Sequence, residues 1–281
     1  MNGSNVLDGC TIGFIGGGNM ARAIIAPLIM KKVIQPERVI ISAKTSKTRQ
    51  HWQKVYGVRT VEHNTDVLLC DIIFLAIKPQ CLDTAIKQAF DVIPDEKQRI
   101  FVSIAAGVTL DRLKQIMAKY GNPYKAKIIR TMPNMPLSVS EGITLYSRNE
   151  YVSEKEAIPV VEMFSHIGIV QEIDESLMNV AGGLAGCGPA FGYLMIEALA
   201  DGAVKHGLPR ELAMKFSAQV LVGAGKMVIK TEKHPGILKD EVCSPGGTTI
   251  AGVHQLEIGA VRASLMNAVE AAVNRSKELG C

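Results

Sequence analysis

The first residues that could do chemistry are the glycines of the segment GFIGGGNMA. Gly16 and Gly18, followed by Asn19, Met20 and Ala21, give the spacing Gly-x-Gly-x-x-Ala between an apolar run and a helix-forming run. In this context the first glycine permits a tight turn, the second lets a pyrophosphate approach the backbone, and the small third residue keeps the helix close to the sheet. The free N–H groups of the helix then meet the phosphates. The segment therefore predicts a dinucleotide site, and a glycine-rich turn without a ligand is the alternative.

The end of the second predicted strand indicates which nicotinamide dinucleotide binds. NAD-selective sites place an Asp or Glu there, about 20 residues after the glycines, where it binds the ribose 2′-OH. This chain has Ser42, Lys44 and Thr45 instead, with no carboxylate in the segment IISAKTSKTR. Because hydroxyl and cationic side chains suit a 2′-phosphate, we expect NADPH, with NADH as the second candidate. A solvated basic loop is the alternative interpretation.

Further strand ends should meet at the same edge of the sheet and form the nicotinamide site. Small residues or prolines follow three of them, in LAIKPQ, SIAAGVT and RTMPNMP. A flat ring can lie close to such turns, and ligands of open parallel sheets bind at the carboxyl ends of the strands. Taken singly, each is an ordinary strand-to-loop turn. The further candidates for cofactor contact are Asn64, Ala76, Lys78, Pro79, Ala105, Ala106 and Gly107.

A second glycine-bearing segment, VCSPGGTTIAG, interrupts a half of the chain that is otherwise apolar and helical. Ser244 is a good N-cap with a proline after it, while Gly246 and Gly247 remove side chains that would keep a ligand from the backbone. Thr248 and Thr249 then offer N–H and hydroxyl donors at a helix start, where the helix dipole favours an anion. The segment predicts an anion site, and a helix–helix corner without a ligand is the alternative.

The elements that position these residues follow from the apolar pattern. Short β-rich runs, several of them apolar on both faces, alternate with helical runs in the first half of the chain. We predict strands at 11–15, 38–42, 58–61, 71–77, 100–104, 126–130, 141–147 and 168–173, and helices at 19–32, 46–56, 80–90, 109–119 and 153–165. From residue 175 only helical runs follow, at 189–206, 209–230, 235–242, 248–257 and 259–279. The fold class is therefore an α/β Rossmann-type doubly wound domain, residues 1–174, and then an all-α domain, residues 175–281.

The helical half should need a partner subunit. Its segment 213–229 is apolar or small around most of its circumference. A surface helix of a monomer could not have this composition, and so short a half has too little surface of its own to cover such helices. We therefore expect a homodimer, with residues 175–281 as the dimerisation and substrate-binding domain.

Composition limits the class of protein. Of 281 residues, 47% are hydrophobic and 21% are charged, which indicates an ordered globular chain. The 31 Lys and Arg residues exceed the 27 Asp and Glu residues, which gives a formal net charge of +4. So small and dispersed an excess of positive charge predicts no nucleic-acid or membrane-surface role. The sequence has no run of 18 apolar residues, so no membrane span is expected. The six cysteines form no CxxC pair and no histidine belongs to a convincing triad, so neither a metal site nor a hydrolase is expected. Without a leader pattern at the N-terminus, we expect a cytoplasmic protein.

These motifs together resemble the pyrroline-5-carboxylate reductase family. The resemblance is carried by GFIGGGNMA, AIKP, AAGVT, GCGPAF, ADGAVKHGLPR, HPGILKDEVCSPGGTTIAG and NAVEAAVNRSKEL, and it covers essentially the whole chain. It implies NAD(P)H-dependent reduction of the cyclic imine 1-pyrroline-5-carboxylate to L-proline, the last step of proline biosynthesis. It also implies a dimer of interlocked C-terminal helices, often assembled further into a decamer. Members often have Asn-Arg or Ser-Ser where this chain has Ser42-Ala43-Lys44.

The resemblance and the anion segment together predict how the substrate binds. The imine carries a carboxylate, and we expect Ser244, Gly246, Gly247 and Thr248 to bind it. We expect Thr249 to act as the catalytic residue by reaching the region of the ring nitrogen. Glu232, in the preceding turn, would favour the protonated imine. Because a protonated cyclic imine is already electrophilic, a weak polar contact can replace the strong acid that a ketone requires, and orientation becomes the main task of the site.

Two other functions fit part of the pattern. A 3-hydroxyacid dehydrogenase of similar two-domain architecture needs a catalytic lysine early in the second domain, where Lys205 is the nearby candidate, but this function leaves SPGGTT unexplained. A non-catalytic NADPH-binding regulator would keep the nucleotide site without the chemistry. Activity with the imine separates both from the reductase.

Overall fold

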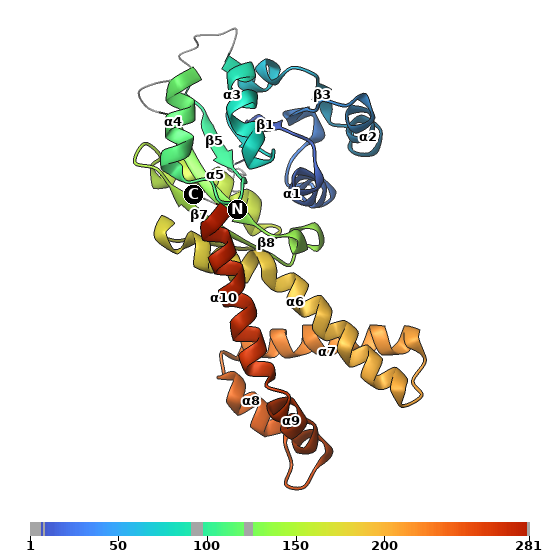
Figure 1. The fold of residues 1–281 in the computed structure, drawn as a ribbon. Coiled ribbons are helices and arrows are strands. Elements are labelled where there is room, and N and C mark those ends of the chain that lie inside the picture. The colour runs from blue at the N-terminus through green and yellow to red at the C-terminus, as the bar shows by residue number, and fades with distance from the viewer. Residues whose placement is uncertain (1–6, 8, 91–97, 121–125, 280–281) are drawn as a thin grey trace, which may run out of the picture. The chain divides into compact units, whose positions relative to one another are not determined.

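The computed structural model describes residue 7 and residues 9–90, 98–120 and 126–279. The chain divides into two compact units, each of which is described here by itself (Figure 1). The first unit contains Met1–Gly186 and Val273–Cys281, and the second contains Cys187–Ala272. An α/β first part and a helical second part confirm the predicted fold class. The boundary after residue 174 stays a prediction.

The first unit is built on a sheet whose described part has eight strands, in the order β3-β2-β1-β4-β5-β6-β7-β8. The strands are β1 (Ile12–Ile15), β2 (Val39–Ser42), β3 (Arg59–Val61), β4 (Ile72–Leu75), β5 (Ile100–Ser103), β6 (Lys127–Pro133), β7 (Gly142–Arg148) and β8 (Gly168–Glu172). Neighbours from β3 to β6 pair in parallel, β7 is antiparallel to β6, and β8 is parallel to β7. The order 3-2-1-4-5-6 is that of the Rossmann fold, whose ligands bind where the order reverses. That point lies between β1 and β4.

Helices follow most strands of the first unit. They are α1 (Asn19–Met30), α2 (Ser46–Tyr56), α3 (Leu82–Phe90), α4 (Leu110–Tyr120) and α5 (Glu154–Ser165). Single-turn or short helices also occur, namely η1 (Pro36–Arg38), η2 (Asn64–Leu69), η3 (Pro79–Cys81), η4 (Met135–Val139) and η5 (Glu175–Leu177). These short helices were not predicted, because so few residues cannot show a helical apolar period.

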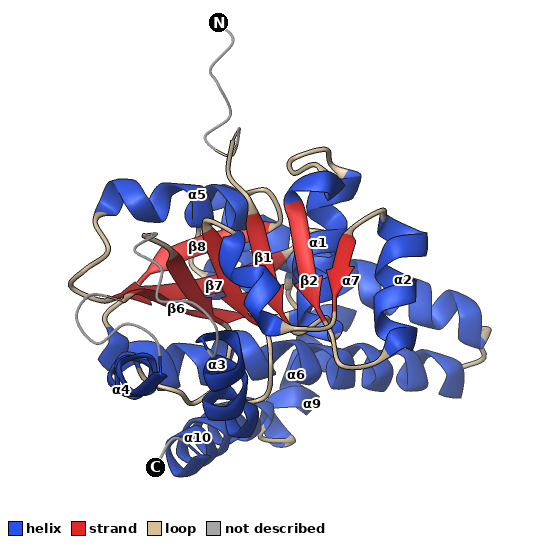
Figure 2. Cartoon of the chain, turned by 90° about the horizontal axis from the view of Figure 1, so that it is seen from above, coloured by secondary structure: helices blue, strands red, loops and turns tan. Residues whose placement is uncertain are grey.

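Helices cover both faces of the sheet, with α1 and α5 on one side and α3 and α4 on the other (Figure 2). Successive strand residues point to opposite faces. Phe14 and Phe74 stack with ring centroids 4.4 Å apart in the cluster that includes α1 and α5. Ile73 and Leu75, from the same strand as Phe74, belong to the cluster with α3 and α4. The central strands are therefore buried on both faces, as their composition predicted.

The first long helix of the helical part begins earlier than predicted. The helical part contains α6 (Met178–Lys205), α7 (Arg210–Thr231), α8 (Pro235–Val242), α9 (Thr248–Ile258) and α10 (Val261–Leu279). The prediction that the first long helix starts near Pro189 is wrong, because α6 runs through this proline. Pro189 has no N–H to donate to the carbonyl of Ala185, four residues earlier. The buried side chain of Asn134 donates its Nδ2 to that carbonyl at 2.9 Å, so the oxygen keeps a partner and the helix continues.

The second unit has little core of its own. In α7 only Ala213 and Ser217 are buried, while Phe216, Val220 and Ile229 are 51%, 59% and 66% exposed. The helical stretches Glu175–Lys205 and Arg210–Thr231 are long and apolar enough to cross a membrane, by length and composition alone. Such a helix needs either lipid or protein over its apolar face.

Helix α5 begins with a capping box that is tied to the sheet. Ser153 Oγ accepts a hydrogen bond from the Glu156 N–H at 3.4 Å, and Glu156 Oε2 accepts one from the Ser153 N–H at 2.9 Å. Lys127, on β6, also donates to the Glu156 carboxylate. The contact with Lys127, followed by those with Ser153, lowers the pKa of the Glu156 carboxyl from 4.5 to about 2. This carboxylate therefore joins α5 to β6.

Replacing Glu156 by Gln should destabilise the protein at neutral pH and less so in acid. A carboxyl whose pKa is lower in the folded than in the unfolded state stabilises the fold above its unfolded pKa, and this stabilisation is lost as the pH falls toward the folded pKa. Because the side chain is 36% exposed, we expect a cost of about 1 kcal/mol at neutral pH. Urea unfolding measures the difference in unfolding free energy between the two proteins. This difference should become smaller as the pH falls from about 4.5 toward 2. A difference independent of pH would contradict the assigned role.

Candidate functional site

The turn after β1 accepts only glycine at its first position. Gly16 has φ +103°, a conformation that L side chains rarely adopt. A Cβ placed there would lie 2.4 Å from the carbonyl oxygen of Ala76 and 2.7 Å from Cγ2 of Ile77. The Gly16 N–H donates to the carbonyl oxygen of Ser42 at 3.0 Å, so the turn is also joined to the end of β2. Gly16 thus brings the ends of β1, β2 and β4 together.

The start of α1 offers backbone donors to a ligand. Gly18 is the N-cap, with φ −79° and ψ −167°, and no side chain caps the helix. A Cβ at Gly18 would meet no atom within 4 Å, so there is open space above this residue. The N–H groups of a first helical turn have no partner within the helix and favour an anion. The geometry is therefore that of a phosphate-binding turn.

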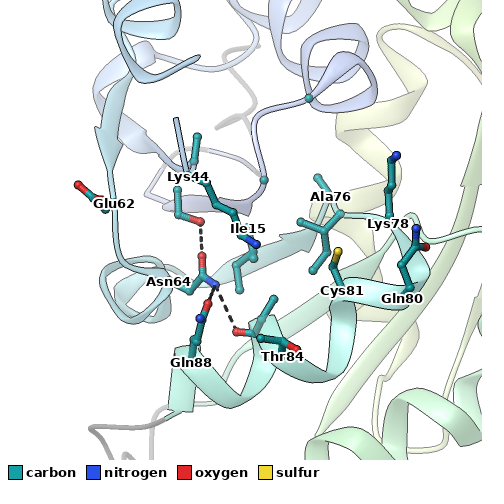
Figure 3. A pocket seen from close by; sticks show the side chains of 16 residues that line it. Ile15, Lys44, Glu62, Asn64, Ala76, Lys78, Gln80, Cys81, Thr84 and Gln88 are labelled. Atoms are coloured by element: carbon teal, nitrogen blue, oxygen red, sulfur yellow. Dashed lines mark hydrogen bonds between the residues drawn. The ribbon is translucent and has the colours of Figure 1, made fainter. Parts of the chain in front are cut away.

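A pocket of about 420 Å³ opens at this edge of the sheet (Figure 3). Its lining residues are Ile15, Gly16, Gly18, Ser42, Ala43, Lys44, Glu62, Asn64, Ala76, Ile77, Lys78, Gln80, Cys81, Thr84, Ala85 and Gln88. Figure 3 shows Lys44, Glu62 and Asn64 at one end of the pocket and Lys78, Gln80 and Cys81 at the other. The pocket lies at the topological switch point between β1 and β4, where the fold class predicts a ligand.

The structure brings many of the predicted cofactor residues together. Gly16, Gly18, Ser42, Lys44, Asn64, Ala76 and Lys78 all line the pocket. Other predicted residues, all within the described ranges, do not line it: Asn19, Met20, Ala21, Thr45, Pro79, Ala105, Ala106 and Gly107. Ala21 is 1% exposed, as expected of the residue that packs α1 on the sheet. Thr45 is the N-cap of α2, where its Oγ1 accepts from the Thr48 N–H at 3.3 Å.

Ser42 and Asn64 form part of the pocket wall and are hydrogen-bonded to each other. The Ser42 hydroxyl, 1% exposed as a residue, donates to Asn64 Oδ1 at 2.7 Å. Asn64 Nδ2 in turn donates to the carbonyl oxygen of Ala85 at 3.3 Å and to Gln88 Oε1 at 3.4 Å. A hydroxyl has one proton to donate, and that of Ser42 is engaged in orienting Asn64. In this structure Ser42 therefore positions the side chain of Asn64.

The loop after β2 is held by an arginine outside the pocket lining. Arg49 Nη1 donates to the carbonyl oxygens of Ala43 and Lys44 at 2.7 and 3.1 Å. Its Nη2 forms an ion pair with Glu62 Oε2 at 3.0 Å. Arg49 is 19% and Glu62 62% exposed as side chains. The loop that carries Lys44 is thus fixed through its backbone.

Several residues that line the pocket were not predicted from the sequence. Glu62 stands directly after β3, so the rule that ligands bind at the carboxyl ends of parallel strands would have located this acid. Gln80 and Cys81 lie on η3, and Thr84 and Gln88 on α3. These residues belong to no motif, and only the tertiary path of the chain brings them to the pocket.

The turn after β5 is braced by a largely buried ion pair. Gly107 has φ +77°, which favours glycine. Three residues later, the Leu110 N–H donates to Glu175 Oε1 at 2.7 Å. The same oxygen accepts from Arg130 Nη1 at 2.8 Å, and the Arg130 side chain is 8% exposed. The start of α4 is therefore fixed to β6 and η5.

The SPGGTT segment forms a turn followed by a helix. The Gly247 N–H donates to the carbonyl oxygen of Ser244 at 3.0 Å, and Gly246 has φ +67°. Proline second and a left-handed glycine third is the pattern of a type II turn. Helix α9 starts at Thr248, as predicted, but the prediction that Ser244 is the N-cap is wrong, because Gly247 is the N-cap of α9. No side chain caps α9, so its first N–H groups stay open to an anion.

A second hollow, of about 490 Å³, lies along α9. It is lined by Gly246, Gly247, Ile250, Ala251, Val253, His254 and Glu257. The predicted residues Ser244, Thr248 and Thr249 lie on the same turn and helix start without lining this hollow. Glu232 is the C-cap of α7, with φ +54°, and within the described residues no hydrogen bond or ion pair joins it to residues 244–249.

Two family models match the chain. Residues 175–279 match the model described as pyrroline-5-carboxylate reductase dimerisation, and residues 11–107 match the model described as NADP oxidoreductase, coenzyme F420-dependent. The pyrroline-5-carboxylate reductase of Synechocystis sp. is 42% identical over 270 residues, which are 96% of this chain and 98% of the relative. That of Arabidopsis thaliana is 40% identical over 269 residues, 95% of each chain.

Solved structures agree with the sequence relatives. Plasmodium falciparum pyrroline carboxylate reductase with NADP bound has a TM-score of 0.84 and 32% identity, covering 97% of this chain and 99% of that one. A pyrroline-5-carboxylate reductase from Coxiella burnetii has a TM-score of 0.87 at the same identity and coverage. Similarity of this kind extends over both the dinucleotide turn and the SPGGTT segment. The chain belongs to the pyrroline-5-carboxylate reductase family.

Proposed function

We propose that this chain is an NAD(P)H-dependent oxidoreductase that reduces 1-pyrroline-5-carboxylate to L-proline, in the last step of proline biosynthesis. The observation that carries the proposal is the pocket at the β1–β4 switch point, closed by a turn in which only glycine fits at position 16. Relatives named for this activity match nearly the whole chain.

The residues of the pocket fit NADPH. Gly18 leaves space for a pyrophosphate beside the uncapped start of α1, including the N–H groups of Asn19 and Met20. Lys44 supplies a positive charge at the end of β2 for the 2′-phosphate. Lys78 lines the other end of the same pocket, where the nicotinamide half would lie. When bound, the dinucleotide supplies the hydride that reduces the C=N bond.

The remaining candidates for cofactor contact lie next to these residues in the sequence. Ala21, Thr45 and Pro79 would keep the surrounding backbone in place. The turn after β5 is formed by Ala105, Ala106 and Gly107. Because the start of α4, which follows this turn, is fixed by Glu175, the turn can support a flat ring that lies against it. Their roles rest on the position of the turn at the carboxyl edge of the parallel sheet.

The substrate carboxylate is proposed to bind at the start of α9. The N–H groups of Thr248 and Thr249 have no intrahelical partner, and Gly246 and Gly247 keep the approach clear. Ser244 closes the preceding turn through its carbonyl oxygen. This leaves the Thr249 hydroxyl to contact the region of the ring nitrogen, with Glu232 stabilising the protonated imine.

The chain is proposed to act as a homodimer through its helical part, assembled into a larger homo-oligomer such as a decamer. Phe216, Val220 and Ile229 on α7 are exposed within one chain, and a second copy would cover them. The apolar stretches in α6 and α7 that reach the length of a membrane span are then subunit contacts in a cytoplasmic enzyme. No nucleic-acid partner is proposed, because the net charge is only +4.

Sedimentation equilibrium at micromolar concentration should show a dimer or a multiple of it. A Phe216→Glu variant should shift the protein toward a smaller species, because a charge is costly in a desolvated apolar interface. Lys215→Glu, on the neighbouring exposed position, serves as the control for added negative charge. A stable monomer of 30.3 kDa in the unmodified protein would contradict the proposal.

The reaction itself is tested by the loss of reduced-nicotinamide absorbance. The purified protein should oxidise NADPH when pyrroline-5-carboxylate is added and form proline in equal amount. It should not reduce NADP with 3-hydroxyisobutyrate, the substrate class of the alternative dehydrogenase. A folded oligomer that binds NADPH but leaves the imine unreduced would contradict the reductase and favour the non-catalytic regulator.

A further inference from the structure

We propose that Glu62 sets the balance between NADPH and NADH, by opposing the 2′-phosphate that Lys44 attracts. The inference rests on the proposed cofactor site. It assigns Glu62 as a specificity-determining residue, and Arg49 as the residue that holds its carboxylate at the edge of the pocket.

The sheet register places Glu62 and Lys44 at the same edge. β2 and β3 are parallel neighbours, with Ser42 paired to Val61. Glu62 directly follows β3, and Lys44 stands two residues after β2. Both side chains line the pocket at the end that also contains Asn64 (Figure 3). This chain thus has no acid at the end of the second strand, where NAD-selective folds carry one, and has one directly after the third.

Arg49 fixes the position of this acid. Its Nη2 lies 3.0 Å from Glu62 Oε2, and its Nη1 donates to the carbonyl oxygens of Ala43 and Lys44. A guanidinium with three protein acceptors has little freedom to turn toward a ligand. Arg49 thus ties Glu62 to the loop that presents Lys44.

The two cofactors respond to a carboxylate in opposite ways. NADPH carries a dianionic phosphate on the adenosine ribose, and a nearby carboxylate repels it. NADH carries a hydroxyl at the same position, which can donate a hydrogen bond to the carboxylate. The ammonium group of Lys44 attracts the phosphate and therefore favours NADPH over NADH. The positive charge of Arg49 reduces the repulsion by Glu62 without removing it. A pocket end with Lys44 and this ion pair therefore admits both cofactors, with Glu62 limiting the preference for NADPH.

Cofactor titrations without substrate test the proposal. Trp52, the single tryptophan of the chain, is buried and donates its Nε1 to the carbonyl oxygen of Gly17 at 3.0 Å, so its fluorescence should report binding at the glycine turn. In Glu62→Gln the Kd of NADPH relative to that of NADH should fall about fivefold. In Lys44→Ala the same ratio should rise. Both shifts should shrink as salt is added, because the charges are exposed.

A matched control removes the same charge elsewhere. Glu37 is exposed on η1, directly before the start of β2 and thus at the other end of that strand. Glu37→Gln should leave the ratio of the two Kd values unchanged. An unchanged ratio in Glu62→Gln, or an equal shift in Glu37→Gln, would overturn the proposal. Equal weakening of both cofactors in Glu62→Gln would also overturn it, since that result assigns Glu62 to loop structure alone.

This test is independent of the proposed reaction. If the chain binds both cofactors but leaves the imine unreduced, the proposed function fails while the Kd ratio still decides the role of Glu62. If the imine is reduced and the ratio does not respond to Glu62→Gln, the proposed function stands and this inference fails.

Discussion

Gly18→Ala is expected to weaken NADPH binding about a hundredfold, a loss of about 2.7 kcal/mol, while the fold stays intact. At φ −79° and ψ −167° an alanine is unstrained, and its Cβ would meet no protein atom within 4 Å. The open space is where the pyrophosphate is proposed to lie against the start of α1. The added methyl group therefore affects the ligand and spares the protein, apart from a small loss in N-cap preference.

Gly16→Ala should behave differently. Here φ is +103° and the new Cβ would come within 2.4 Å of the Ala76 backbone oxygen, so the turn itself must move. We expect a loss of about 2–3 kcal/mol in unfolding free energy together with the loss of binding. The two variants thus separate a residue that contacts the ligand from one that shapes the turn.

Thermal unfolding and NADPH titration of both variants measure these effects. Gly18→Ala should keep a transition close to that of the unmodified protein, and Gly16→Ala should unfold at a lower temperature. Wild-type affinity in Gly18→Ala would show that the pyrophosphate does not bind at this turn. An equal loss of stability in both variants would contradict the open space above Gly18.

Sequence patterns were sufficient where local backbone chemistry decides the structure. Gly16 and Gly18 could be identified because a tight strand–helix turn admits few other residues. The eight strands were predicted from their apolar runs, because strands that are buried on both faces are apolar at successive positions. Lys44 was located by the rule that the residue that binds the adenosine ribose stands at the end of the second strand.

Contacts between distant segments could not be predicted in this way. Helix α6 passes through Pro189 because the side chain of Asn134, 51 positions before Ala185, binds the carbonyl that the proline leaves free. Glu62 reaches the dinucleotide pocket because β3 lies at the edge of the sheet beside β2. The N-cap of α9 is Gly247 and not Ser244, because Ser244 instead closes a hydrogen-bonded turn with Gly247. In each case a tertiary or turn contact outweighs the local propensity.

Thr249→Val is expected to lower kcat/KM for the imine about tenfold or more while NADPH affinity and stability change little. Thr249 is the second residue of α9, and valine keeps its branched shape and its backbone N–H, so the helix start is preserved. Only the hydroxyl proposed to contact the ring nitrogen region is lost, and one such hydrogen bond contributes roughly 1.4 kcal/mol.

The matched variant is Thr249→Ser, which keeps the hydroxyl and removes the methyl group. It should retain most of the activity, whereas Thr249→Val should not, when initial rates are measured over a range of imine concentrations. Because α9 has no side-chain cap, neither substitution removes a capping contact, so a loss of activity in Thr249→Val cannot come from an uncapped helix. Equal activity in Thr249→Val and the unmodified protein would leave the backbone N–H groups of α9 to bind the carboxylate, but would remove Thr249 from the catalytic step. Equal loss in both variants would assign the effect to packing of the side chain at the helix start.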